Sequence, residues 1–171
     1  MKLHLDLDQI PHELRDRDQW VGFLVEPPAA SGGRLQKTPL VADDPTRKAS
    51  STKPTTWRSF DVAVAGLRQG KFNAIGYALN DDYTCIDLDH FPAECQPTPF
   101  AASAIDRCAS YTEWSASRKG VHVLLHGTLP DDCQHAFDDA EVYGTTRFIV
   151  ITGDRLPDRP EQIQQNDEAV K

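Results

Sequence analysis

The segment Cys85-Ile-Asp-Leu-Asp89 places two carboxylates one residue apart inside an apolar run, and it constrains the fold more than any other feature. Such a run predicts a β-strand, in which successive side chains alternate between two faces. Asp87 and Asp89 should therefore share one face, while Ile86 and Leu88 enter a core on the other. Two like charges this close repel unless a divalent cation lies between them, and oxygen ligands favour Mg²⁺ or Mn²⁺. The alternative is a solvent-facing strand edge that carries two aspartates.

Length and composition predict a protein with one well-packed domain. The chain has 171 residues, of which 39% are hydrophobic, so it differs from disordered chains. No apolar run approaches the roughly 18 residues that a membrane span needs. The first residues lack the apolar core and the cleavage site of a secretory signal. We therefore expect a cytoplasmic protein without a membrane partner.

The charge balance limits the class of nucleic-acid partner. The formal net charge of −8 argues against a strongly basic, sequence-independent DNA-binding protein. A nucleic-acid enzyme remains possible, because local basic patches and bound metal ions decide the contact with phosphate.

The cysteines do not form a recognisable motif. There are four, and none belongs to a Cys-x-x-Cys pair, so we expect reduced thiols rather than a disulfide framework. A zinc site built from His90, Cys95 and Cys108 is the alternative, although its spacing is irregular.

Strand and helix patterns alternate along the chain, and hairpins dominate, so the predicted class is α+β. The predicted domain spans residues 1–156, and residues 157–171 form a frayed polar tail or a linker to a missing domain. We expect a helix that a threonine near Thr56 caps and that Gly70 ends, and a second helix over Phe100–Cys108. The predicted hairpins join Trp20–Val25 to Gln36–Val41, Ala74–Leu79 to Tyr83–Leu88, and Ala140–Tyr143 to Arg147–Thr152.

A polar turn precedes one of these strands. The segment Ser115-Ala-Ser-Arg-Lys-Gly-Val-His122 offers hydroxyls, cations and backbone N–H groups that suit a triphosphate. An ordinary basic turn with a surface histidine is the alternative.

Further along, Glu141 can add a third carboxylate to the aspartate pair, or can be a solvated strand residue. Arg147 opens an apolar strand, either as a phosphate ligand or as a charge at the rim.

Taken in order, these features resemble the archaeo-eukaryotic primase superfamily, and most closely its bifunctional primase–polymerase N-terminal domain family of plasmids, phages and other mobile elements. The resemblance spans nearly the whole chain, and the ordered set is more specific than any one motif. Its segments are Ile10-Pro-x-Glu-Leu-Arg, Gln19-Trp-Val21, Lys37-Thr-Pro39, Ala49-Ser-Ser-Thr52, Thr56-Trp57, Ile75-Gly76, Ile86-Asp-Leu-Asp89, Ser110-Tyr-Thr-Glu113, Gly120-Val-His122, Glu141-Val-Tyr143 and Thr152-Gly153.

The resemblance implies a two-lobed α+β fold with a catalytic antiparallel sheet similar to that of RNA-recognition motifs. It also implies a two-metal Mg²⁺ or Mn²⁺ site for template-directed nucleotidyl transfer. Implied partners are single-stranded DNA or primer–template, nucleoside triphosphates, and a helicase or helical primase C-terminal domain. The implied metal ligands are Asp87, Asp89 and Glu141; the implied nucleotide-binding residues are His122, Ser117, Arg118, Lys119, Arg147 and Lys37. Lys37 belongs to the family's Lys-x-Pro motif, for which a structural role is the alternative.

Two turns depart from the family pattern. Ala116 and Arg118 replace the proline and glycine of the usual Ser-Pro-Ser-Gly turn. An arginine there either strains a position of positive φ or adds a phosphate ligand. After Tyr143 the usual Asp-Ser-Gly-Arg is Gly144-Thr-Thr-Arg147, which keeps only the arginine. The family's helical domain and helicase do not follow, so we expect a stand-alone relative or an N-terminal domain.

Two competing functions remain at this stage. A catalytically silent module that binds nucleotide or DNA in a replication complex would fit the net acidity, but would leave the acidic cluster without a purpose. A metal-dependent nuclease would use the same carboxylates, but would not need a turn suited to a triphosphate.

Overall fold

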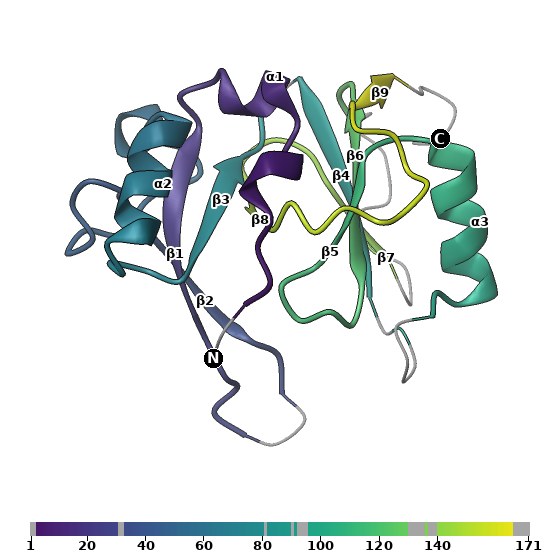
Figure 1. Cartoon of the computed structure of the whole chain (residues 1–171), viewed down its shortest axis with the longest axis horizontal. Helices are drawn as coiled ribbons and strands as arrows, with labels where there is room; N and C mark the ends of the chain where they lie inside the picture. Colours follow the sequence, from purple (N-terminus) through teal and green to yellow (C-terminus); the bar gives the residue numbers. More distant parts are fainter. Residues whose placement is uncertain are drawn as a thin grey trace.

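Two β-sheets that pack against each other form the centre of the molecule (Figure 1). The computed structural model describes residues 3–30, 33–80, 82–89, 91, 96–129, 136 and 140–165. Both sheets are antiparallel apart from one short parallel strand, which is compatible with the predicted α+β class. In Figure 1 helices α2 and α3 lie at opposite ends of the molecule, with the sheets between them.

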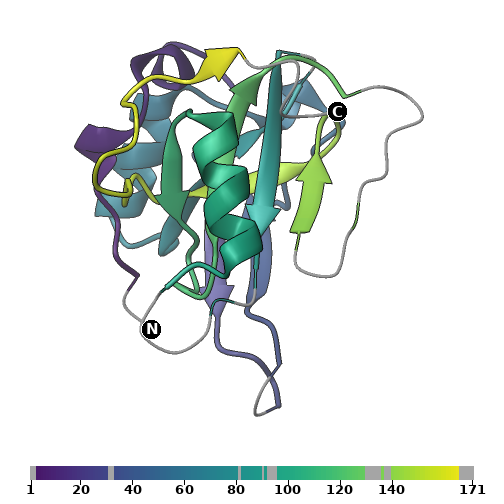
Figure 2. The ribbon, with the colours of Figure 1, turned by 90° about the vertical axis from the view of Figure 1, so that its right-hand side faces the viewer.

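The first sheet, sheet A, has the strand order β2-β1-β3-β8. The predicted hairpin between its first two strands is confirmed, with Phe23 opposite Pro39. It projects from the body of the molecule in Figures 1 and 2. The strands are β1 (Trp20–Glu26), β2 (Gln36–Leu40), β3 (Ala74–Ala78) and β8 (Phe148–Ile151).

The second sheet, sheet B, has the order β5-β6-β4-β7, and β9 pairs in parallel with β6. Helix α3 (Pro99–Cys108) covers one face of it (Figure 2). On that face Ile105 packs with Ile86 and Leu88 in an apolar cluster, as the alternation predicts. The strands are β4 (Tyr83–Leu88), β5 (Thr112–Trp114), β6 (Val121–His126), β7 (Ala140–Tyr143) and β9 (Gln164–Gln165).

Two predicted hairpins are wrong. Strand β3 pairs with β1 and β8 in sheet A, whereas β4 pairs with β6 and β7 in sheet B. Likewise, β7 belongs to sheet B and β8 to sheet A. At both turns the chain passes from one sheet to the other, so strands that follow each other in sequence do not pair.

Helix α2 (Phe60–Arg68) begins later than predicted. Thr56 does not cap it, because its hydroxyl donates to the backbone carbonyls of Lys53, at 2.8 Å, and Ser50, at 3.1 Å. These bonds hold a 3₁₀ turn, η2 (Pro54–Thr56), ahead of the helix. The remaining helical segments are η1 (Leu7–Gln9) and α1 (His12–Arg15).

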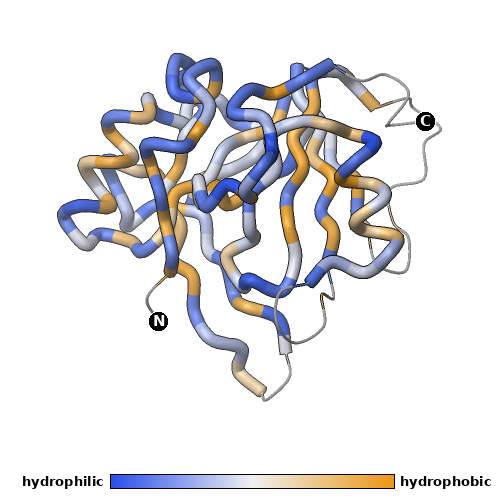
Figure 3. The backbone as a smooth tube through the Cα atoms, turned by 45° about the vertical axis from the view of Figure 1, so that its right-hand side comes forward, coloured by the Kyte–Doolittle hydropathy of each residue, from blue (hydrophilic) through white to orange (hydrophobic). Residues whose placement is uncertain are grey.

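Strand β8 is the edge of sheet A and lies against the uncovered face of sheet B. Ile149 and Ile151 on one side of β8 share an apolar cluster with Cys85 and Leu124 of sheet B. Residues of β8 also line a cavity, which is described below. Hydrophobic stretches follow the strands of both sheets in Figure 3, in keeping with this shared core.

The structure also bears on the cysteines and the tail. Cys85 and Cys108 are buried free thiols, as predicted, while His90 and Cys95 of the alternative zinc site lie outside the described residues. The predicted frayed tail is packed over its first part, because Ile163 is buried and β9 joins sheet B. Among the described residues, no helix is long and apolar enough to cross a bilayer.

Candidate active site

Four ionisable side chains stand in a row across the face of sheet B that α3 does not cover. The strand register places Asp87 of β4 opposite both His122 of β6 and Glu141 of β7. Glu113 of β5 lies opposite His122 on its other side. Because residues directly opposite each other point to the same face, the row follows from the register alone. Asp87 therefore faces away from Ile86 and its core, as predicted.

Asp87 and His122 form the centre of this row. Asp87 Oδ1 lies 3.8 Å from His122 Nε2. The histidine side chain is 2% exposed and that of Asp87 is 17% exposed. Asp87 Oδ1 is buried and has no hydrogen-bond partner among the described residues. A buried acceptor without a donor is costly, so this oxygen is suited to a ligand that supplies positive charge.

The electrostatic environment of Asp87 shows which charges converge on it. Burial raises the pKa of Asp87 above its ordinary value. The negative charges of Asp89 and Glu141 raise this pKa further. His122 and Lys37 lower it, because positive charge favours the carboxylate. Two of the predicted metal ligands, Asp89 and Glu141, thus act electrostatically on the third.

The other two predicted metal ligands have contacts of their own. Glu141 accepts a hydrogen bond from the hydroxyl of Tyr143, and its Oε1 lies 3.8 Å from Arg34 Nη1. Asp89 follows β4 directly and lies beside Gly120. Within the described part of the chain, no three His, Cys, Asp or Glu side chains are already gathered as a metal-binding group.

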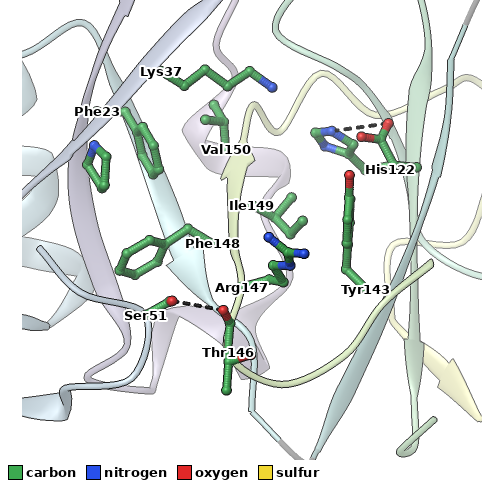
Figure 4. Close-up of a pocket in the computed structure, with 12 residues that line it drawn as sticks. Phe23, Lys37, Ser51, His122, Tyr143, Thr146, Arg147, Phe148, Ile149 and Val150 are labelled. Carbon is green, nitrogen blue, oxygen red and sulfur yellow. Dashed lines mark hydrogen bonds and ion pairs between the residues drawn. The ribbon is translucent and has the colours of Figure 1, made fainter. Parts of the chain in front are cut away.

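A cavity of about 330 Å³ lies between β8 and the row on sheet B (Figure 4). Asp87 and His122 line its sheet B side. Phe23, Phe148 and Val150 of sheet A supply an apolar wall. The full set of lining residues is Phe23, Lys37, Pro39, Ser51, Asp87, His122, Tyr143, Thr146, Arg147, Phe148, Ile149 and Val150.

Two cations reach the same cavity. Figure 4 shows Lys37 of β2 extending from the sheet A side, and Arg147 beside Tyr143. The guanidinium carbon of Arg147 lies 5.7 Å from the centre of the Tyr143 ring. Lys37, Asp87, His122 and Arg147 are thus the predicted site residues that the structure brings to one cavity.

The predicted phosphate-binding turn lies just before β6 and does not line this cavity. Ser117 Oγ lies 3.0 Å from Ser115 Oγ and accepts a bond from the backbone N–H of Lys119. Arg118 has a φ of +55°, as expected if it replaces a glycine. Its guanidinium pairs with Asp154 and lies over the ring of Trp114.

Several site residues had no assigned role in the sequence prediction. Ser51 and Tyr143 fall in segments that carry the family resemblance, and both line the cavity. Thr146 also lines it, and its carbonyl accepts a hydrogen bond from Ser51 Oγ at 2.8 Å (Figure 4). Glu113 was part of a motif, but its contact with His122 depends on which strands pair. The one feature of the sequence that could have drawn attention to Glu113 is a charged residue inside a short extended segment.

The chain is similar to a known protein, and no protein-family model matches it. It is 40% identical over 117 aligned residues to a protein of Nitratiruptor phage NrS-1 that is described as a DNA primase-polymerase. The alignment covers 63% of this chain, whereas the chain spans only 16% of the length of the phage protein. The similarity supports a relationship to primase–polymerases.

Proposed function

We propose that this chain carries the catalytic site of a metal-dependent, template-directed nucleotidyltransferase, acting as a DNA primase, a DNA polymerase or both. One observation carries the proposal: Asp87, which is in register with Glu141 on sheet B, lines one cavity together with Lys37 and Arg147. The cavity volume of about 330 Å³ is within the range of small-ligand sites. The similarity to the phage protein supports the same activity.

We propose Asp87, Asp89 and Glu141 as the ligands of two Mg²⁺ or Mn²⁺ ions. The buried, unpartnered Oδ1 of Asp87 fits this role, because a cation would satisfy it and offset the neighbouring negative charges. Such ions, when bound, activate a primer hydroxyl and stabilise the charge on a leaving pyrophosphate.

The other residues of the cavity suit a nucleoside triphosphate. Lys37 and Arg147 would offset the charge of the phosphates, and His122, once protonated at Nε2, would donate to a phosphate oxygen. The apolar wall with Phe23 and Phe148 leaves room for the less polar part of a nucleotide. The turn with Ser117, Arg118 and Lys119 is a second, weaker proposed phosphate contact, because it leads directly into the strand of His122 while the Arg118 guanidinium already pairs with Asp154.

We further propose that the two sheets form the two-lobed primase fold, with sheet B as the catalytic sheet that resembles an RNA-recognition motif. The proposed polymer substrate is single-stranded DNA or a primer–template in the replication of a phage, plasmid or other mobile element. Since the chain matches only a small part of its relative, a helicase or helical C-terminal domain is the proposed partner.

Primer extension tests this function. A labelled primer–template is incubated at low salt with Mn²⁺ and nucleotides, using wild type, Asp87→Ala/Asp89→Ala, and Asp61→Ala. Asp61 is an exposed carboxylate on α2 and serves as the matched control. We expect extension by wild type and by Asp61→Ala, and none by the double variant. Equal extension by all three would place the activity elsewhere. No extension and no nucleotide binding by wild type would contradict the proposal.

A further inference from the structure

The proposed function gives no role to two segments that carry the family resemblance, Ser110–Glu113 and Thr152–Gly153. They meet at the buried carboxylate of Glu113. Glu113 is 0% exposed. Its oxygens accept hydrogen bonds from the backbone N–H groups of Thr152, at 3.0 Å, and Gly153, at 2.8 Å. The hydroxyl of Tyr111 donates a further bond at 2.8 Å. Since these donors belong to the main chain or to a fully buried side chain, the position of the Glu113 carboxylate is set by the fold.

The fourth neighbour of this carboxylate is His122. His122 Nδ1 lies 3.3 Å from Glu113 Oε1. A carboxylate only accepts hydrogen bonds, so the proton of this contact belongs to Nδ1. The other ring nitrogen, Nε2, then faces Asp87 and the cavity. Histidines that bind ligands through one nitrogen are commonly oriented by an acceptor at the other.

We propose that Glu113 is the positioning residue of His122: it holds one proton on Nδ1 and thereby points Nε2 at the nucleotide. A second proton, taken up at Nε2 when the nucleotide binds, is donated to a phosphate oxygen. The inference rests on the proposed function for its meaning, but the ring geometry can be tested without any activity. Glu113 itself lies behind the histidine and does not line the cavity.

The turn at Gly153 explains how sheet A contributes to the orientation of His122. Gly153 has a φ of +67°, and a Cβ there would lie 1.8 Å from the carbonyl oxygen of Asp6. Only glycine fits, and this backbone directs its N–H to Glu113. The turn directly follows β8, which also lines the cavity. Glu113 therefore ties the orientation of His122 to the opposite wall of the site.

A purely structural role for Glu113 is the competing explanation. The carboxylate joins β5 of sheet B to the end of β8 in sheet A, and removing it would weaken that junction in any case. The two roles differ in what happens at the imidazole. A structural anchor would leave the protonated nitrogen of His122 undetermined and would act on nucleotide binding independently of that residue.

The first test is the tautomer of His122 in the wild-type protein. Long-range ¹⁵N–¹H correlation spectra of ¹⁵N-labelled full chain are recorded at pH 8, without metal or nucleotide, and the His122→Gln spectrum identifies the ring. We expect the signature of a ring protonated at Nδ1. A ring protonated at Nε2, or a mixture of both tautomers, would overturn the proposal. Because no variant of Glu113 is needed, the result does not depend on how such a variant folds.

The second test is a double-mutant cycle on the affinity for a nucleoside triphosphate. Glu113→Gln alone is expected to raise the dissociation constant by roughly 10-fold, the lower end of the effect of residues that orient a metal-binding histidine. In a His122→Ala background it should change the dissociation constant less than about 2-fold, because its effect passes through the ring. Equal effects in both backgrounds would show that Glu113 does not act through His122.

A matched control separates orientation from stability. Thr112 is the buried neighbour of Glu113 on β5, faces away from the cavity, and donates to the carbonyl of Ser110. Thr112→Val should lower the melting temperature without changing nucleotide affinity. If primer extension fails while the tautomer is as expected, the proposed function is wrong and the positioning of His122 stands. If extension succeeds with the other tautomer, only the role of Glu113 is wrong.

Discussion

Gly120 and Asp89 lie so close together that no side chain fits between them. A Cβ on Gly120 would stand 2.2 Å from the carbonyl oxygen of Leu88, 3.0 Å from the Cα of Asp89 and 3.1 Å from its Oδ1. Two of these atoms are backbone, which cannot rotate away. Gly120 precedes β6 and Asp89 follows β4, so this contact sets how the ends of the two central strands approach each other.

Gly120→Ala should therefore displace Asp89 and weaken metal-dependent activity. We expect a loss of stability of about 1–3 kcal/mol, typical of overpacking, together with a higher Mn²⁺ concentration for half-maximal primer extension. Gly144→Ala is the matched control, since its nearest neighbour is the end of the Leu129 side chain, at 3.2 Å. Titration of Mn²⁺ in the extension assay checks the prediction. An unchanged Mn²⁺ requirement for Gly120→Ala would remove Asp89 from the site.

Replacing either of two buried tyrosines by phenylalanine should change the free energy of unfolding, in opposite directions. The hydroxyl of Tyr77 is buried and has no hydrogen-bond partner among the described residues, whereas that of Tyr111 donates to Glu113. Tyr77→Phe should raise the free energy of unfolding by about 1 kcal/mol, because an unsatisfied group is removed. Tyr111→Phe should lower it by about 1–3 kcal/mol, because a bond to a charged group is lost. Urea denaturation of both variants measures these changes; a loss for Tyr77→Phe would show that its hydroxyl is paired.

The sequence predicts individual strands well, but not which strands pair. The alternation around Asp87 correctly places Ile86 and Leu88 in a core, because period-two patterning depends only on local backbone geometry. The hairpins after β3 and β7 are wrong because a short polar turn also suits a passage between two sheets. That choice depends on partners distant in sequence, such as Gly76 opposite Val150.

The same limit applies to the candidate site. Asp87, His122 and Arg147 could be predicted because their segments resemble a known family, and the structure brings all three to one cavity. The contact of Glu113 with His122 could not, because it exists only once β5 pairs with β6. The orientation of the Arg118 side chain could not be predicted either, because its partner Asp154 lies 36 positions away in sequence.

The different surroundings of two arginines predict different roles in nucleotide binding. Arg147 lines the cavity and stacks on Tyr143, whereas Arg118 pairs with Asp154 and Trp114 outside it. Arg147→Ala should raise the KM for nucleotide by roughly 10-fold, the value of one charge-assisted hydrogen bond.

Arg118→Ala should change that KM less than about 2-fold and mainly lower stability, because its guanidinium already has protein partners. Steady-state extension at varied nucleotide concentration compares the two variants. A larger rise in KM for Arg118→Ala than for Arg147→Ala would instead make the turn before β6 the main phosphate contact, ahead of the cavity.

Asp87 should be a residue that lowers stability in the absence of metal. Burial raises its pKa, so the folded protein holds a proton at pH values where the carboxyl of the unfolded chain, with a pKa of about 3.9, has lost it. Stability therefore falls as the pH rises through the interval between these two pKa values, and the full penalty is present above the pKa of the folded state. Asp87→Asn removes the charge and should raise the free energy of unfolding at pH 7 by about 1 kcal/mol.

A divalent cation should reverse the order of stability, so that the wild type becomes more stable than Asp87→Asn. If Asp87 is a ligand, Mn²⁺ at ten times its dissociation constant stabilises the wild type by about 1.4 kcal/mol through mass action. Asp87→Asn should gain much less, because the amide carries no charge for the ion. Thermal denaturation of both proteins at pH 7, with chelator and with Mn²⁺, measures the two shifts. The same Mn²⁺ shift in both would show that the ion binds elsewhere, whereas a wild type more stable than Asp87→Asn in chelator would show that Asp87 has a partner within the folded chain.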